Sequence, residues 1–229
     1  MILNIDDIAI EVLHKPIKNI NLRIYPPDGL IKVSVPLRYS EQLIRQHLID
    51  KMPWICAQRE RIRRNAQPQN QILQSGSAVN FMGHNYILII NEQNGPSHIE
   101  INQQIIHCFI QPNASQAQLI TLFERWYRRE MEALIPDLIT HWAAIIGVQV
   151  NEWGIKKMKT RWGSCNVRAA RIWLNLSLIK KPLSCLEYVL VHELVHLLEA
   201  SHNARFYALM TQFMPQWREY QSILTAVGH

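Results

Sequence analysis

The segment SCLEYVLVHELVHLLEASH, residues 184–202, places two histidines four residues apart and a glutamate directly after the first of them. Residues four apart on a helix share a face, with Cβ atoms about 5–6 Å apart, so His192 and His196 can bind one metal ion. Glu193 lies one residue round the helix, where its carboxylate can take a proton from a water that the metal activates. This HExxH spacing predicts half of a zinc hydrolase site.

A catalytic zinc site needs three protein ligands and one open position. His202 is the predicted third ligand, because a helix that stops near Ala200 or Ser201 allows the chain to fold back toward the metal. Glu199 is the rival ligand. On an unbroken helix, with about 1.5 Å of rise per residue, it would stand about 10 Å along the axis from the first histidine. We therefore expect Glu199 to lie beside the ligands or to pair with Arg205.

The same segment carries signals for a buried helix. Ser184 and Glu187 have the spacing of a capping box, directly after Pro182. A helix that is apolar nearly all round is typical of a protein core, and the apolar residues here are Leu186, Val189, Leu190, Val191, Leu194, Val195, Leu197 and Leu198. The alternative interpretation is a core helix whose histidines are satisfied by neighbouring side chains. Two histidines at metal spacing, with the glutamate and a third histidine, favour the metal site.

Three stretches together resemble a known family: KTRWGSC at residues 159–165, WLN at residues 173–175, and HELVH followed by HNARFY within residues 192–207. This set is similar to the YgjP-like metallopeptidases, relatives of the SprT-like zincins. The layout, a β-rich N-terminal part before a helix and a zinc-binding half, covers most of the chain. The resemblance implies a minimal zincin with Zn²⁺ on the three histidines and Glu193 as the catalytic base. It supplies no role for residues 161–165.

Composition is consistent with an intracellular globular protein. The 229 residues could form one large domain or two small ones. The N-terminus, MILNIDD, lacks the basic and apolar regions of a secretory signal, so we expect a cytoplasmic protein. No apolar run approaches the roughly 20 residues that span a membrane, which favours a soluble chain without a membrane partner.

The cysteines form no CxxC pair, which argues against a zinc knuckle or a disulfide framework and fits a reducing cytosol. They are Cys56, Cys108, Cys165 and Cys185. Cys165 lies within the RWGSC stretch and could be a latent metal ligand or a reactive thiol. A buried structural thiol is the commoner case.

Patterns of alternation and turn residues predict an α+β fold. Residues 1–112 should form a β-rich region with a helical insert, and residues 113–229 a zincin-like catalytic half. Strands are expected at residues 8–13, 20–25, 30–35, 79–81, 86–90, 98–101 and 105–110, with a hairpin turn at residues 26–29. Helices are expected at residues 41–50 and from Pro53 onward, before a linker at residues 65–71.

In the catalytic half, a long helix should run from Ser115 or Gln116 to Ile146, bent or split at Pro136 and ended by Gly147. Two strands, at residues 150–161 and 171–176, should precede the zinc helix, and helices at residues 204–213 and 215–225 should follow it. By resemblance to zincins, residues 155–161 are the candidate edge strand for pairing with an extended substrate.

The formal net charge of +6 favours an anionic partner. One basic cluster comprises Lys156, Lys157, Lys159 and Arg161, and a second comprises Arg59, Arg61, Arg63 and Arg64. Nucleic acid could bind such clusters through its phosphates, with Trp54 or Trp162 stacking on bases, although a solvated face is the simpler interpretation. We take Lys159, Arg161 and Trp162 as candidate substrate-binding residues, for a peptide carboxylate or a triphosphate.

The leading hypothesis is a zinc-dependent metallopeptidase with Glu193 as general base. The family resemblance is also associated with nucleoside triphosphate pyrophosphohydrolysis, of UTP in particular, and the basic strand makes that alternative credible. A third hypothesis is a nucleic-acid-binding module with a structural zinc, or, as in the SprT-like relatives, a protease that acts on DNA-bound protein. The sequence makes no prediction about oligomeric state.

Overall fold

Strands and helices are mixed throughout the chain, which confirms the predicted α+β class. The computed structural model describes residues 1–6, 8–25, 29–65 and 72–227, and the side chains of residues 61–65, 226 and 227 lie outside that description. The chain divides into two compact units, Met1–Gln71 and Ile72–His229. Each unit has its own buried apolar core.

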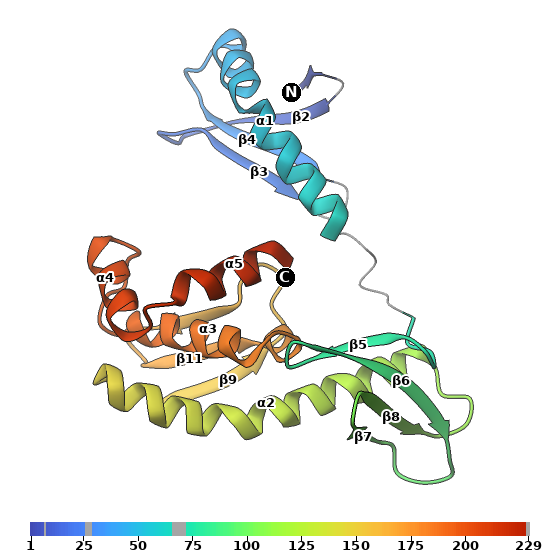
Figure 1. Cartoon of the computed structure of the whole chain (residues 1–229). Helices are drawn as coiled ribbons and strands as arrows, with labels where there is room; N and C mark the ends of the chain where they lie inside the picture. The colour runs from blue at the N-terminus through green and yellow to red at the C-terminus, as the bar shows by residue number, and fades with distance from the viewer. Residues whose placement is uncertain (7, 26–28, 66–71, 228–229) are drawn as a thin grey trace. The chain divides into compact units, whose positions relative to one another are not determined.

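The N-terminal unit is a four-stranded sheet with a helix packed on one face (Figure 1). In sheet order β1-β2-β4-β3, its strands are β1 (Ile2–Ile5), β2 (Ile8–Lys15), β4 (Leu30–Pro36) and β3 (Asn21–Tyr25). β3 and β4 form the predicted hairpin, with Tyr25 opposite Leu30. Residues 26–28 of the predicted turn lie outside the described residues.

Helix α1 (Glu41–Asn65) is continuous, whereas the sequence predicted two helices separated before Pro53. Ile44, Leu48, Met52 and Ile55 are buried against the sheet and form one stripe that runs past the proline. Pro53 is exposed on the opposite side, as is Ile49, whose carbonyl loses its helical donor. Because Ile49 is exposed, its carbonyl can bind water in place of the lost donor. The buried stripe on the other side of the helix then keeps α1 continuous past Pro53. The predicted linker lies almost entirely at residues 66–71, outside the described part of the chain.

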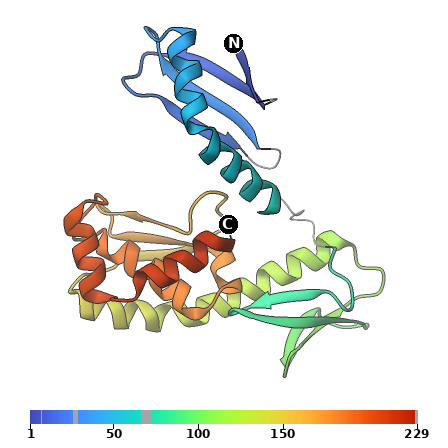
Figure 2. The same ribbon diagram turned by 45° about the horizontal axis from the view of Figure 1, so that its top comes forward.

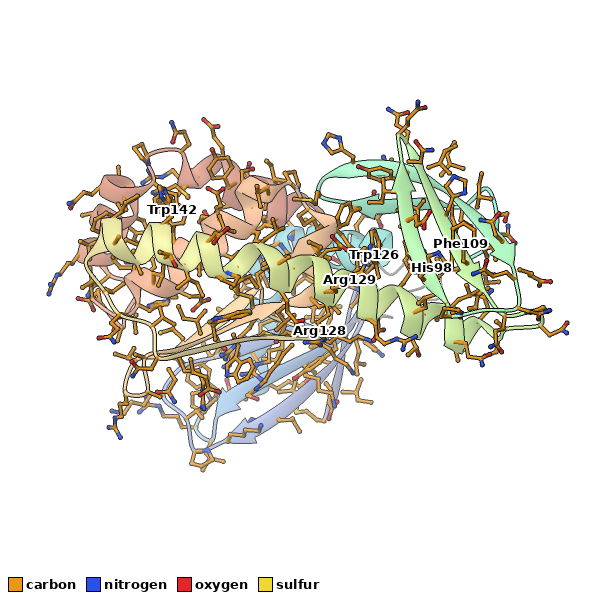
Figure 3. The ribbon with its side chains drawn as sticks, turned by 90° about the horizontal axis from the view of Figure 1, so that it is seen from below. His98, Phe109, Trp126, Arg128, Arg129 and Trp142 are labelled. Atoms are coloured by element: carbon orange, nitrogen blue, oxygen red, sulfur yellow. The ribbon has the colours of Figure 1, made fainter. Side chains whose placement is uncertain are left out.

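The second unit begins with another four-stranded sheet. Its order is β5-β6-β8-β7, from β5 (Ala78–Phe81), β6 (His84–Glu92), β8 (Ile105–Ile110) and β7 (His98–Asn102). One face packs on the N-terminal half of α2 (Gln116–Ile146), where Phe81 lies 4.7 Å from Trp126 between ring centroids. On the other face His98 stacks on Phe109, and Figure 3 shows these two rings together.

This packing places the unit boundary after Gln71, so the predicted boundary at residues 112 and 113 falls inside the second unit. Apolar residues of the β5–β8 sheet, such as Leu88 and Ile106, belong to the same core as the zinc-motif helix. Helix α2 joins them, because its first half lies along the sheet and its second half runs beside β9 and α3 (Figure 1). A change of composition along the chain does not reveal such a shared core.

The long helix α2 has the predicted ends. Ser115 caps it with a reciprocal capping box to Gln118, and Gly147 ends it in the left-handed region at φ 76°. Pro136 lies within the helix and does not split it. Among the described residues, no helix is long and apolar enough to cross a membrane.

The rest of the second unit surrounds the HExxH segment. A three-stranded sheet has the order β10-β11-β9, from β10 (Gly163–Asn166), β11 (Arg171–Asn175) and β9 (Glu152–Lys156). After the short 3-10 helix η1 (Leu176–Lys180) come α3 (Leu183–Val195), α4 (Ala204–Phe213) and α5 (Trp217–Val227). Figure 2 shows α4 and α5, in red, beside α3. The HExxH helix is thus enclosed by the sheet, α2 and the closing helices.

Candidate metal centre

Helix α3 begins two residues earlier than the predicted capping box places its start. Pro182 is the N-cap residue and no side chain caps the helix, so the predicted capping box of Ser184 and Glu187 is wrong. The β5–β6 turn packs tightly against this end, since a Cβ on Gly83 would lie 2.9 Å from the Pro182 backbone. Tertiary packing therefore fixes the start of α3 in place of a local cap.

The regular helix ends at Val195 and not near residue 200 as predicted. Beyond Val195 the backbone keeps turning in the same sense through hydrogen-bonded turns. The last of these bonds runs from the Glu199 amide to the Val195 carbonyl at 3.0 Å. The chain then reverses, and the Asn203 side chain accepts from the Phe206 amide at 3.0 Å to cap α4. This reversal returns His202 to the face of α3 that carries the first two histidines.

The three histidines converge. One ring nitrogen from each of His192, His196 and His202 lies within 4.8 Å of the other two, and the Nε2 atoms of His192 and His202 are 2.9 Å apart. Fully buried Phe206 lies under all three rings, with centroid distances of 4.7–4.9 Å. Three imidazoles are a donor set that suits zinc, and three protein ligands leave a fourth position open. The group could hold a catalytic metal ion.

Electrostatics favour the neutral imidazole that metals bind. Burial, with smaller effects from His196 and His202, lowers the pKa of His192 to about 3. Burial also lowers the pKa of His196. The Nδ1 atom of His196 lies 3.1 Å from the Glu199 carbonyl oxygen, which can only accept, so Nδ1 carries the proton and Nε2 keeps its lone pair.

Glu199 lies beside the histidine group, as predicted. Its carboxylate is 3.9 Å from the Arg205 guanidinium, and its other oxygen accepts from the Ser201 amide at 3.2 Å. The carboxylate is thus used in the loop between His196 and His202, and the carbonyl of the same residue orients a ring. Glu199 supports the geometry of the site without joining the histidine group.

Glu193, next to the histidines on α3, is 6% exposed. Burial raises its pKa to about 8, and the nearby Arg161 guanidinium opposes that rise. A carboxylate with a pKa raised toward neutrality is suited to accept and return a proton. A bound cation would lower this pKa again.

The RWGSC stretch now has a structural role. Its last three residues begin strand β10, which the sequence did not predict, and Gly163 faces Glu193. A Cβ at Gly163 would lie 2.6 Å from Glu193 Oε1 and 2.9 Å from Val189 Cγ1. Glycine is therefore required for the carboxylate to occupy its position. Cys165 on the same strand is half-buried, and burial raises its pKa to about 11; it is not in the histidine group.

Gly163→Ala is expected to displace Glu193 and to destabilise the fold by about 1–3 kcal/mol, the usual range for overpacking. Hydrolytic activity should fall even where the variant is fully folded, because the methyl group meets the Glu193 carboxylate directly. Urea unfolding and activity at a temperature where the variant stays folded measure the two effects. Gly95→Ala is the control, since a Cβ there makes only ordinary contacts, at 3.6 Å. Full activity in Gly163→Ala would show that Gly163 is not needed to position the Glu193 carboxylate.

Asn175 holds the loop between β9 and β10. Its side chain is fully buried, and Nδ2 donates to the carbonyls of Met158 at 2.9 Å and Arg161 at 2.8 Å. Its Oδ1 accepts from the Ser177 amide at 3.1 Å. The amide thus fixes the backbone on which Arg161 approaches Glu193.

Asn175→Leu, which keeps the size and removes the buried amide, is expected to destabilise the fold by about 2 kcal/mol or more, because the Met158 and Arg161 carbonyls lose their donor. Urea unfolding measures this difference. Asn151→Leu is the matched control, since Asn151 is exposed and donates one bond of 3.3 Å to Ala169. Equal stability of the two variants would show that Asn175 does not hold the loop.

The predicted strand at residues 150–161 is shorter than expected and ends at Lys156. Residues 157–162 form a loop, so residues 155–161 are not the edge strand beside the HExxH helix. That place belongs to β10, which pairs with β11 alone among the described strands and whose Gly163 faces Glu193. The correction arises because the chain crosses from one edge of the sheet to the other within this loop.

The three predicted substrate-binding residues lie on this loop or at its end. Arg161 is exposed and near enough to Glu193 to affect its pKa. Trp162 is half-buried, with the Lys181 ammonium 5.7 Å from its ring centroid. Lys159 is exposed and, among the described side chains, forms no hydrogen bond or ion pair. Arg161 is thus linked to the Glu193 carboxylate.

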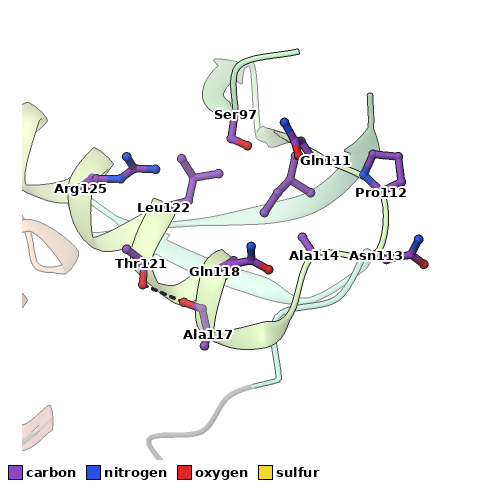
Figure 4. Close-up of a pocket in the computed structure, with 11 residues that line it drawn as sticks. Ser97, Gln111, Pro112, Asn113, Ala114, Ala117, Gln118, Thr121, Leu122 and Arg125 are labelled. Atoms are coloured by element: carbon purple, nitrogen blue, oxygen red, sulfur yellow. Dashed lines mark hydrogen bonds between the residues drawn. The ribbon is translucent and has the colours of Figure 1, made fainter. Parts of the chain in front are cut away.

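A pocket of ≈430 Å³ lies away from the histidines, between the start of α2 and the loops of the β5–β8 sheet (Figure 4). Arg125 is the one charged side chain in its lining, together with amides and hydroxyls such as Gln118 and Thr121. No histidine, cysteine or carboxylate lines it. This pocket therefore offers none of the side chains that bind a catalytic zinc ion.

The YgjP-like, metallopeptidase domain family matches residues 18–226. The chain belongs to the YgjP-like metallopeptidase family. Among solved structures, the crystal structure of the metallopeptidase zymogen of Pyrococcus abyssi abylysin is similar at 23% identity and a TM-score of 0.37, over 40% of this chain and 93% of that one. No curated protein matches the chain. The family resemblance in the sequence is confirmed.

Family membership places this YgjP-like chain among the metallohydrolases and implies a catalytic metal, usually zinc. Sequence reasoning did not find β10, the role of Gly163, or the aromatic residues near the histidines. Two local signals pointed to the last group: Tyr188 precedes His192 by four residues, on the same helix face, and Tyr207 follows His202 in the HNARFY stretch.

Proposed function

We propose that this chain is a zinc-dependent metallopeptidase with His192, His196 and His202 as metal ligands and Glu193 as general base. The observation that carries the proposal is the buried Glu193 carboxylate beside three converging imidazoles. A zinc ion on these ligands would lower the pKa of a water and polarise the scissile carbonyl. Glu193 takes the proton from the attacking water and returns it to the departing amine.

Strand β10 supports a peptide as the substrate. It is an edge strand, and Gly163 brings its first residue against Glu193. An extended peptide can pair with the free main-chain groups of such an edge, which needs little sequence information. Pairing at β10 would hold a peptide bond close to the carboxylate that acts on it.

Nucleoside triphosphate hydrolysis is the second candidate, and the cations around the residue 157–162 loop favour it. Arg161 is near Glu193, Lys181 lies over Trp162, and Lys180 is close enough to Lys157 for the two charges to interact. Several of these cations already have partners: Lys157 pairs with Glu124, and Lys180 lies 5.3 Å from the Tyr127 ring centroid. This internal use is the reason that we rank the nucleotide below the peptide.

Both candidates can be tested on one preparation of zinc-loaded protein. A peptide mixture is analysed by mass spectrometry for new N-termini, and a panel of nucleoside triphosphates is analysed for pyrophosphate and phosphate. We expect new N-termini and no release from the nucleotides above that of Glu193→Gln. Pyrophosphate release that vanishes in Glu193→Gln, without peptide cleavage, would reassign the site to nucleotides.

Nucleic acid as a partner remains a prediction. Of the second basic cluster, only Arg59 has a described side chain. It is half-buried and packs beside Gly29, where an added Cβ would lie 3.4 Å from Arg59 Cγ. If DNA-bound proteins are the substrates, binding to DNA should weaken steeply with salt, since released counterions drive it. Fluorescence anisotropy of labelled duplex DNA over a salt series measures this, and binding that is weak at every salt concentration would exclude DNA.

A further inference from the structure

A pocket of ≈270 Å³ adjoins the histidine group. His192 and His202 form one wall, and the remaining lining comes from α3, α4 and α5. Its other lining residues are Tyr188, Phe206, Tyr207, Met210, Trp217 and Gln221. A substrate whose scissile bond lies at the histidines has this hollow next to it.

Three aromatic rings in the lining are nearly parallel. The plane of Trp217 is inclined by 8° to that of Tyr188 and by 17° to that of Tyr207, with centroid distances of 6.5 Å and 5.6 Å. Trp217 is fixed from outside the pocket, because its Nε1 donates to Thr211 Oγ1 at 3.1 Å and the Arg218 guanidinium lies 4.5 Å from its ring centroid. Trp217 is therefore held in place before any ligand binds.

The lining is apolar and aromatic, and besides the histidines its polar groups are the two phenols and the amide of Gln221. Burial raises the pKa of the Tyr188 phenol, and the neighbouring Gln221 side chain opposes that rise. No carboxylate lines the pocket to bind a cation, and no lysine or arginine lines it to bind an anion. Burying an unpaired charge there would be costly.

The size of the pocket matches one side chain. Pockets for drug-sized ligands usually occupy about 300–1,000 Å³, so ≈270 Å³ is small for a whole nucleotide. A large uncharged side chain would gain most, because it can pack against the aromatic lining and displace water from apolar walls. Small side chains would leave the hollow partly filled.

We propose that this pocket selects the substrate residue next to the scissile bond and favours large, uncharged side chains, aromatic ones above all. The inference rests on the proposed peptidase function, and it assigns Tyr188, Tyr207 and Trp217 as specificity-determining residues. A peptide with phenylalanine at that position is preferred over the same peptide with alanine, lysine or glutamate.

The test measures binding with zinc-loaded Glu193→Gln, which should hold peptides without cleaving them. Peptides that differ only in the residue after the expected cleavage site carry phenylalanine, leucine, alanine, lysine or glutamate, and calorimetry gives each Kd. We expect phenylalanine to bind at least about tenfold more tightly than alanine or lysine. Cleavage by the parent protein should follow the same order in kcat/KM.

Two further variants examine the pocket itself. Gln221→Trp, at the exposed rim, should fill the hollow and reduce the preference for phenylalanine at least about fivefold, whereas Gln212→Trp, on an exposed part of α4 outside the pocket, should not. Tyr207→Ala should weaken the aromatic preference by removing a wall. Binding or cleavage with no preference, or a preference unchanged in Gln221→Trp, would overturn the assignment of the pocket. No binding and no cleavage of any peptide would instead refute the proposed peptidase.

Discussion

Glu193→Gln is expected to keep the metal and to lower hydrolysis by about 10²–10⁴-fold, the usual contribution of a general base. Glutamine keeps the size of the side chain above Gly163, so the contact between strand and helix survives. It cannot accept the proton of the attacking water at the same position. Zinc content by atomic absorption and turnover on a cleaved peptide measure the two halves of this prediction.

Glu187→Gln is the matched control, because Glu187 lies on the same helix, is partly buried and is outside the histidine group. It should retain full turnover. If Glu193→Gln stayed fully active with zinc bound, Glu193 would not be the base. If that variant lost its zinc, the carboxylate would hold the metal site together, which the geometry does not indicate.

Alanine in place of His192, His196 or His202 is expected to weaken zinc binding by more than about 100-fold, beyond the usual effect of losing a residue that only supports a ligand. Each histidine contributes one of three ring nitrogens in a mutually adjacent group. Competition with a chelator of known affinity gives the zinc Kd, and circular dichroism shows whether the variant is folded.

His84→Ala, an exposed histidine on β6, is the control and should bind zinc as the parent does. The His202 variant is the most informative, because its role depends on the chain reversal after α3. Unchanged zinc affinity in His202→Ala would exclude it as the third ligand. Glu199 would then be the first residue to reconsider, since it lies in the same loop.

Elements with strong local signals were predicted well. Ser115 and Gly147 mark the ends of α2, and the helix at residues 204–213 matches α4. The first strand hairpin was found because alternation and turn chemistry act within a few residues. The start of α3 and the continuity of α1 were not, because Gly83 packs on α3, and the sheet packs on the apolar stripe of α1, from other parts of the chain.

The candidate site shows the same division. Spacing alone pointed to the HExxH residues and to His202, since residues four apart on a helix share one face. Gly163, Asn175 and Trp217 act across the fold, on a helix, a loop and a pocket that sequence order does not connect. The family resemblance marked the first two stretches, and only the structure shows what they contact.

X-ray absorption at the zinc edge, on the zinc-loaded full chain, tests the central claim most directly. A catalytic site predicts three nitrogen ligands at about 2.0–2.1 Å and one further light atom from solvent, without sulfur. A sulfur ligand at about 2.3 Å would instead bring in a cysteine, with Cys165 near Glu193 as the first candidate, and would indicate a closed structural site. The catalytic account predicts the first spectrum, and the second would contradict it.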